Sequence, residues 1–209
     1  MTASQQVQPE LKHGRIEPGA VHLCVDMQLM FADDTAWKTP WMDRVRPVVA
    51  AIAREHAPAT VFTRFIPAAR PSEGDGAWRR YWKRWPTMTL SELGADKIGL
   101  LPELKALCPP ASVFDKRTYS PWSDGALHAA LQLRACGTLI VTGGETDVCV
   151  LATVLGAIDL GYRVIVVTDA LCSSADETHD AVMTVYHYRY GQQVETVTTE
   201  LLLDEWRPP

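Results

Sequence analysis

The feature that most constrains the fold is a series of short runs rich in Val, Ile, Leu and Phe that alternate with segments of helical length. The runs cover residues 21–26, 60–65, 112–116, 138–142 and 163–167, with a weaker one at 195–198. Continuous apolar strands are buried on both faces, and intervening helices are the crossovers that parallel strands require. The pattern predicts a doubly wound, Rossmann-like α/β fold, in which about six parallel strands carry helices on both faces of the sheet.

The segments between these runs predict the helices and the domain. Helical spacing extends over residues 41–56, 123–135, 147–160 and 174–190, and a short helix ends near residue 206. A chain of 209 residues fits one such domain, which we place at residues 20–209. Residues 1–19 contain Gln, Pro and Gly without periodicity, and we interpret them as a flexible N-terminal arm.

Charge and hydropathy argue against nucleic-acid and membrane partners. The net charge is −5, and the main group of basic residues lies between Arg79 and Arg84. No segment reaches the roughly 18 apolar residues of a membrane span, and the first residues lack the apolar core of a signal peptide. We therefore expect a cytoplasmic protein that acts on a small molecule.

The stretch from residue 66 to residue 111 is the irregular part of the sequence. It contains several prolines and three tryptophans, Trp78, Trp82 and Trp85, at spacings of four and three residues. This spacing places the indoles on one face of a short helix. The helix either docks on the domain or a second subunit, or forms a lid or wall of the substrate pocket. The two interpretations are compatible in a dimer.

Three reactive side chains fall at or just beyond the carboxyl ends of predicted strands, which is where open parallel sheets bind ligands. Asp26 closes the first strand, Lys116 closes the third, and Cys149 lies in the first turn of the helix after the fourth. Each residue alone has an ordinary explanation, such as a turn cap or a solvated lysine. Their convergence on one edge of one sheet indicates a catalytic site.

The segment around Cys149 suits a nucleophile. Gly143 and Gly144 make a tight strand-to-helix turn, and Thr146 or Asp147 can cap the new helix. A thiol in the first turn lies at the positive end of the helix, which favours a thiolate. Free backbone N–H groups at the same terminus can receive an oxyanion.

Two charged residues complete the chemistry of acyl transfer through a cysteine. Lys116 favours the thiolate further, and Asp26 can carry the proton. The sequence has no Gly-x-Ser-x-Gly elbow, no Walker loop and no dinucleotide-binding fingerprint. The five cysteines lack Cys-x-x-Cys spacing, which argues against disulfides and structural zinc, and we interpret Cys24 and Cys136 as core residues.

Three segments resemble signatures of the isochorismatase-like cysteine hydrolases, which include nicotinamidases and N-carbamoylsarcosine amidohydrolases. Residues 23–28 (LCVDMQ), with Phe31 following, resemble the family's first strand. Residues 116–122 (KRTYSPW) are similar to its lysine segment, and residues 143–150 (GGETDVCV) to its nucleophile segment. Each motif alone is weak, but three in the right order and spacing are strong, and the resemblance covers about residues 20–200.

The resemblance implies a six-stranded parallel α/β sandwich, usually assembled as a homo-oligomer such as a dimer or tetramer. It implies that Asp26 takes the thiol proton, Cys149 attacks a carbonyl carbon, and water hydrolyses a thioester after the amine departs. Lys116 would hold this geometry and stabilise charge. The family's oxyanion hole maps onto the backbone N–H groups of Glu145 and Cys149, and the Gly144–Glu145 peptide bond is expected to be cis.

The sequence departs from the metal-binding nicotinamidases, which carry an Asp and a nearby His just after the second strand. Residues 63–67 read TRFIP, with neither ligand, which argues against nicotinamidase activity. We assign all six histidines to structural or surface roles and expect no metal and no cofactor.

These observations favour a hydrolase that cleaves an amide or carbamoyl C–N bond. An isochorismatase-type vinyl ether hydrolase is the first alternative, but true isochorismatases carry another residue at the position of Cys149. A catalytically idle binding protein is the second, and the intact Asp26, Lys116 and Cys149 argue against it.

Aromatic and basic residues supply the candidate substrate contacts. Arg64 either pairs with a substrate carboxylate or forms a structural ion pair. An apolar pocket would be lined by Phe31, Trp37, Trp78, Trp82 and Trp122.

Overall fold

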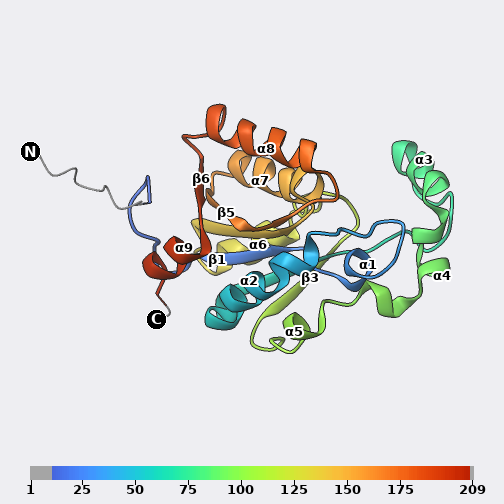
Figure 1. Ribbon diagram of the computed structural model, residues 1–209, viewed down its shortest axis with the longest axis horizontal. Coiled ribbons are helices and arrows are strands. Elements are labelled where there is room, and N and C mark those ends of the chain that lie inside the picture. The colour runs from blue at the N-terminus through green and yellow to red at the C-terminus, as the bar shows by residue number, and fades with distance from the viewer. Residues whose placement is uncertain (1–10, 208–209) are drawn as a thin grey trace, which may run out of the picture.

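The computed structural model describes residues 11–207, and its centre is a six-stranded parallel sheet (Figure 1). The strand order is β3-β2-β1-β4-β5-β6. From β1 the chain adds β2 and β3 on one side, and it then crosses to the other side of β1 to add β4, β5 and β6. The predicted doubly wound fold is confirmed. The strands are β1 (Val21–Val25), β2 (Thr60–Phe65), β3 (Ser112–Lys116), β4 (Thr138–Gly144), β5 (Arg163–Cys172) and β6 (Val194–Val197).

Helices connect the strands, and most lie close to the residues that helical spacing indicates. Short 3-10 turns are η1 (Ala57–Ala59), η2 (Pro86–Met88) and η3 (Ala95–Ile98), and η4 (Thr146–Val150) is a π-helical turn. The α-helices are α1 (Leu29–Ala32), α2 (Met42–Glu55), α3 (Gly76–Arg84), α4 (Leu90–Leu93), α5 (Pro102–Lys105), α6 (Ala126–Leu133), α7 (Leu151–Asp159), α8 (Asp176–Tyr188) and α9 (Thr199–Glu205).

Two apolar layers enclose the sheet because successive side chains of a strand point to opposite faces. In β1, Leu23 and Val25 belong to the layer that contains the buried residues of α6, α7 and α8. Cys24 belongs to the other layer, which contains those of α2 and α9. Figure 1 shows α7 and α8 on one side of the sheet and α2 on the other. The core therefore holds the strands rigidly and leaves their carboxyl ends free to carry a site.

The ordered domain begins earlier than the sequence indicates. Leu11 and Ile16 are buried in the core, and the guanidinium of Arg163 donates hydrogen bonds to the backbone carbonyls of Gly14 and Arg15. Residues 11–19 are therefore packed against the body and are not part of a flexible arm. Irregular backbone gives no periodic signal, so these contacts are not apparent in the sequence. Residues 1–10 of the expected arm lie outside the described residues.

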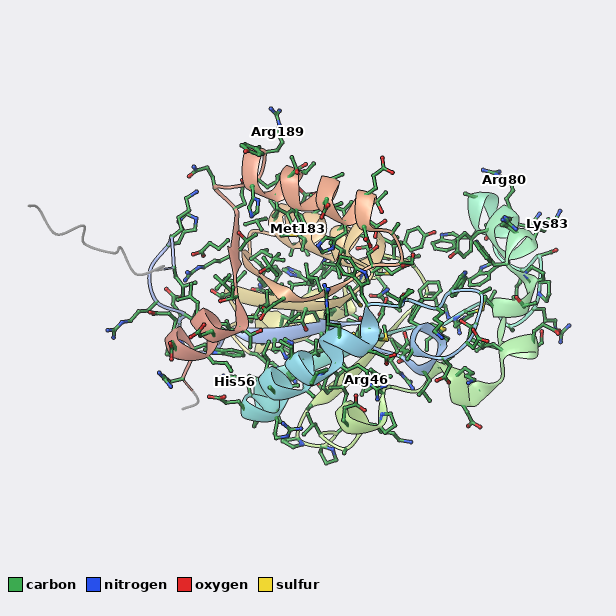
Figure 2. All side chains as sticks on the ribbon, viewed as in Figure 1. Arg46, His56, Arg80, Lys83, Met183 and Arg189 are labelled. Carbon is green, nitrogen blue, oxygen red and sulfur yellow. The ribbon has the colours of Figure 1, made fainter. Side chains whose placement is uncertain are left out.

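The irregular stretch after β2 forms α3, α4 and α5 with turns between them, and α3 lies away from the sheet at one end of the molecule (Figure 1). Trp82 on α3 is buried, while Arg80 and Lys83 are exposed and point outward (Figure 2). The helix is thus amphipathic, with its aromatic face turned inward. No helix within residues 11–207 has both the length and the apolar character needed to cross a membrane.

Candidate active site

Asp26, Lys116 and Cys149 meet at the carboxyl edge of the sheet. Lys116 Nζ lies 2.6 Å from Asp26 Oδ2 and 3.4 Å from Cys149 Sγ, and all three residues are buried. Asp26 follows the end of β1 and Lys116 ends β3, and parallel strands bring these ends to one edge. The turn after β4 supplies Cys149 from the same edge. The predicted convergence is therefore confirmed.

Lys116 is fully occupied by this cluster. Its ammonium group has three N–H donors, and it contacts Asp26, the Cys149 sulfur and the backbone carbonyl of Thr118 at 3.1 Å. Burial alone would lower the pKa of Lys116, but the neighbouring Asp26 and Cys149 outweigh burial and raise it. Lys116 is therefore a cation that holds the other two groups together.

Thr63 on β2 holds the carboxylate of Asp26. The Thr63 hydroxyl donates to Asp26 Oδ1 at 2.6 Å and accepts from the Asp26 backbone N–H at 3.2 Å. Both contacts fix Asp26, whose φ of 50° lies in the left-handed region. Asp26 Oδ2 forms the ion pair with Lys116 at 2.6 Å, which uses one of the two lone pairs of this oxygen. A lone pair on Oδ2 is thus free to accept a proton.

Burial raises the pKa of the Cys149 thiol well above the ordinary value, and the negative charge of Asp26 adds to this effect. The positive charge of Lys116 lowers the pKa, as expected, but burial of the charged sulfur outweighs this attraction. A base must remove the thiol proton, and Asp26 is the group in place.

The turn that presents Cys149 requires glycine. Gly143 has a φ of 103°, and a Cβ built on it would lie 2.1 Å from the carbonyl oxygen of Val25 on the neighbouring strand. A side chain would therefore force β1 and β4 apart. The Gly144–Glu145 peptide bond is cis, as expected.

The helix that follows the turn begins differently from the prediction. Its first turn is η4, and no side chain caps it. The Thr146 hydroxyl donates instead to the Cys172 carbonyl at 3.1 Å. The Asp147 carboxylate accepts from Ser173 and Thr178 at 2.6 Å and 2.5 Å. Both proposed caps therefore bind residues from the end of β5 to the first turn of α8, a contact that sequence spacing does not reveal.

A small cavity of about 50 Å³ lies over Cys149. Water occupies about 30 Å³ per molecule in the liquid, and ligand pockets typically measure about 300–1,000 Å³. The cavity over Cys149 is therefore small beside typical ligand pockets. The cavity is lined by Phe31, Trp37, Phe65, Tyr81, Tyr119, Glu145, Val148 and Cys149.

A larger hollow of about 590 Å³ is lined by residues of the N-terminal segment, η1 and the C-terminal end of the chain, including His56 and Trp206. It belongs to the amino ends of the strands, because its lining includes Ala20, which immediately precedes β1. None of the three reactive side chains lines it. We therefore place the candidate active site in the smaller cavity.

Four of the predicted pocket aromatics lie in or directly behind this lining. Phe31 and Trp37 line the cavity. Trp82 is buried behind it, with its ring 6.1 Å from that of Phe65, and Trp78 packs 4.9 Å from the ring of Tyr119. Trp78 and Trp82 therefore support the wall and do not face the cavity themselves. Within this chain, the tryptophan helix α3 docks on the domain and contributes Tyr81 to the wall of the cavity.

Trp122 and Arg64 lie elsewhere. The Trp122 indole packs on Gly156 of α7 and donates from Nε1 to the Thr153 carbonyl at 2.9 Å. The Arg64 guanidinium forms two hydrogen bonds of 2.7 Å with the Asp115 carboxylate. The structure therefore favours the ion-pair interpretation of Arg64 and gives Trp122 a packing role. Arg64 directly follows Thr63, and Trp122 follows Tyr119 by three residues, but the partners of both side chains lie outside the cavity lining.

The described residues after Thr63 have partners other than a metal ion: Arg64 is held by Asp115, and Phe65 lines the cavity. Within residues 11–207, no group of three or more His, Cys, Asp or Glu side chains is arranged to hold a metal ion.

Five residues of the site escaped prediction: Thr63, Phe65, Tyr81, Tyr119 and Val148. Weak signals exist for four of them, and Val148 directly precedes Cys149. Tyr81 lies three residues after Trp78 and shares its helix face, Tyr119 belongs to the segment that carries Lys116, and Phe65 ends β2. Thr63 has no signal, because a buried threonine in a strand is ordinary.

Comparisons with known proteins agree with this fold. The YwoC isochorismatase family protein of Bacillus subtilis is 30% identical over 114 residues, which are 54% of this chain and 58% of YwoC. The aligned region thus spans little more than half the length of that relative.

Solved structures match over more of the chain. A cysteine hydrolase from Pseudomonas syringae pv. phaseolicola has a TM-score of 0.78 and 21% identity, with 96% of this chain and 98% of that chain covered. N-carbamoylsarcosine amidase from Thermoplasma acidophilum has a TM-score of 0.68 and 23% identity, with 87% of this chain and 96% of that chain covered. These likenesses establish the fold. The isochorismatase domain itself matches residues 20–200, and this chain therefore belongs to the isochorismatase family.

Proposed function

We propose that this protein is a cysteine hydrolase that cleaves the C–N bond of a small amide or carbamoyl compound. The observation that carries the proposal is the buried contact of Lys116 with both Asp26 and Cys149, at 2.6 Å and 3.4 Å. A nucleophile, a carboxylate base and a cation that holds them together are the parts that covalent acyl transfer needs. N-carbamoylsarcosine amidase, a structural neighbour, is by name an enzyme of this class.

The first half of the reaction forms a thioester. Asp26 Oδ2 takes the thiol proton as Cys149 Sγ attacks the carbonyl carbon, and the carbonyl oxygen becomes an oxyanion. We assign the backbone N–H groups of Glu145 and Cys149 to that oxyanion. The C–N bond then breaks, and the departing nitrogen takes the proton from Asp26.

The second half regenerates the enzyme. Water attacks the thioester carbon and gives a proton to Asp26, and the C–S bond breaks to release a carboxylic or carbamic acid. The sulfur recovers its proton from Asp26. Lys116 keeps its charge throughout and prevents Asp26 and the sulfur from separating.

The test is a screen for released ammonia with primary amides, carbamoyl compounds and ureido acids. Cys149→Ala should abolish turnover with any substrate found, while its thermal unfolding stays close to that of the unmodified protein. Asp26→Asn should be nearly as inactive, because an amide cannot accept the proton. Mass spectrometry of quenched reactions should show the acyl group on the peptide that contains Cys149.

A metal chelator separates this proposal from metal-dependent hydrolysis. We expect chelator to change the rate little. Full activity in Cys149→Ala, or complete loss of activity with chelator alone, would refute the proposal.

A further inference from the structure

The lining of the cavity over Cys149 combines aromatic rings with one carboxylate. The rings come from three separate regions of the chain: Phe31 and Trp37 after β1, Phe65 and Tyr81 from β2 and α3, and Tyr119 after β3. They pack edge and face against one another, with Trp37 and Tyr81 centroids 5.8 Å apart. Glu145 is the acidic residue of this lining.

Positive charge is missing from this lining. Within residues 11–207, no Lys, Arg or His side chain lines the cavity. The nearest cation is Lys116, whose three donors are already used by Asp26, Cys149 and Thr118. The basic residues of α3 do not compensate, because Arg80 and Lys83 point outward from the molecule (Figure 2).

The charge of Glu145 is therefore left uncompensated. Its carboxylate accepts one hydrogen bond, from the backbone N–H of Ser174 at 2.9 Å, and forms no ion pair among the described residues. Burial is the main cause that raises the pKa of Tyr81 and of Tyr119, and the charge of Glu145 adds a smaller contribution to both.

We propose that this cavity receives a positively charged group, so that the preferred substrate is a small amide or carbamoyl compound with an alkylammonium substituent. Aromatic faces attract cations within about 6 Å of their centroids, most strongly in desolvated sites. Glu145 adds a direct charge partner. A substrate with a carboxylate would meet the charge of Glu145 and no cationic side chain of the lining.

The substrate class rests on the proposed function, but the binding preference does not. Binding is therefore measured in Cys149→Ala, which cannot react. The probes are two pairs of nearly identical shape: betaine amide with 3,3-dimethylbutanamide, and glycinamide at neutral pH with propanamide. One member of each pair is cationic and the other is neutral. Calorimetric titration gives the ratio of dissociation constants within each pair.

We expect the cationic member of at least one pair to bind about tenfold or more tightly than its neutral isostere, as a desolvated cation–π contact with a charge partner should. Adding Glu145→Gln should reduce the ratio severalfold, because the amide keeps the Ser174 contact but loses the charge. Glu177→Gln is the matched control: it removes an exposed carboxylate of α8 outside the cavity and should leave the ratio unchanged.

Three results would overturn the inference: equal or tighter binding of the neutral isosteres, no binding by either pair, or an unchanged ratio in Glu145→Gln. Ammonia release by the unmodified protein is scored separately. A clear cation preference without hydrolysis of any amide contradicts the proposed function and leaves the cation site standing. Hydrolysis of neutral amides without a cation preference contradicts the cation site and leaves the proposed function standing.

Discussion

Replacing Thr63 by valine tests whether the position of the Asp26 carboxylate governs the reactivity of Cys149. Valine has nearly the shape of threonine but no hydroxyl. The change removes the 2.6 Å hydrogen bond to Asp26 Oδ1 and the 3.2 Å bond from the Asp26 N–H, while the core volume stays almost the same. Thr63→Ser keeps the hydroxyl and is the matched control.

The magnitude follows from burial. Thr63 and Asp26 are almost completely buried, so water cannot replace the lost partner. A hydrogen bond to a charged group contributes about 1.5–3 kcal/mol, and the orphaned N–H adds about 1 kcal/mol. We expect Thr63→Val to lower the free energy of unfolding by about 2–4 kcal/mol. A displacement of the carboxylate by about 1 Å should slow the reaction of Cys149 by about 100-fold.

Two assays measure these effects without a known substrate. Urea unfolding gives the stability change. Alkylation by iodoacetamide, followed by mass spectrometry of the peptide that contains Cys149, gives the reactivity of that thiol among the five cysteines. Thr63→Ser should retain most of both properties. Equal stability and equal Cys149 alkylation in Thr63→Val and the unmodified protein would refute the role that we assign to Thr63.

The remaining predictions concern pH, packing and charge. Burial raises the pKa of Cys24 to about 12, so the folded state holds this proton more tightly than the unfolded state. The free energy of unfolding should therefore fall above about pH 8.5, where the unfolded thiol ionises, by up to about 1.4 kcal/mol per pH unit. Urea titrations across this range should show a shallower decline in Cys24→Ala, and an identical decline would count against the argument. Because the indole packs on Gly156, Trp122→Ala should lower the free energy of unfolding in urea by about 3–5 kcal/mol and leave KM unchanged. A raised KM would show that Trp122 contacts the substrate. Arg64→Met should change stability by less than about 1 kcal/mol in the same assay, because its ion pair with Asp115 is partly exposed. Lys116→Met should cost about 3–5 kcal/mol, because it leaves the Asp26 charge buried without a partner, and a neutral result in urea unfolding would contradict that role.

The sheet, its helices on both faces and the meeting of Asp26, Lys116 and Cys149 were accessible from the sequence. Each depends on a local property: β1 and β4 are mostly apolar, and a reactive residue stands at or just after a strand end. Parallel strands place all such ends on one edge, so a local pattern predicts a long-range contact. The glycine at position 143 is another local signal, because its turn leaves no room for a Cβ.

The lining of the cavity and the protonation of the nucleophile required the assembled fold. Thr63 and Arg64 are neighbours on β2, yet one holds Asp26 in the interior and the other pairs with Asp115 nearer the surface. Tyr81 lines the cavity over Cys149 while Trp122 packs against α7, because the path of the connecting segments sets the direction of each ring. The raised pKa of Cys149 likewise depends on burial by the surrounding side chains, and burial is a property of the whole molecule, whereas helix position is local.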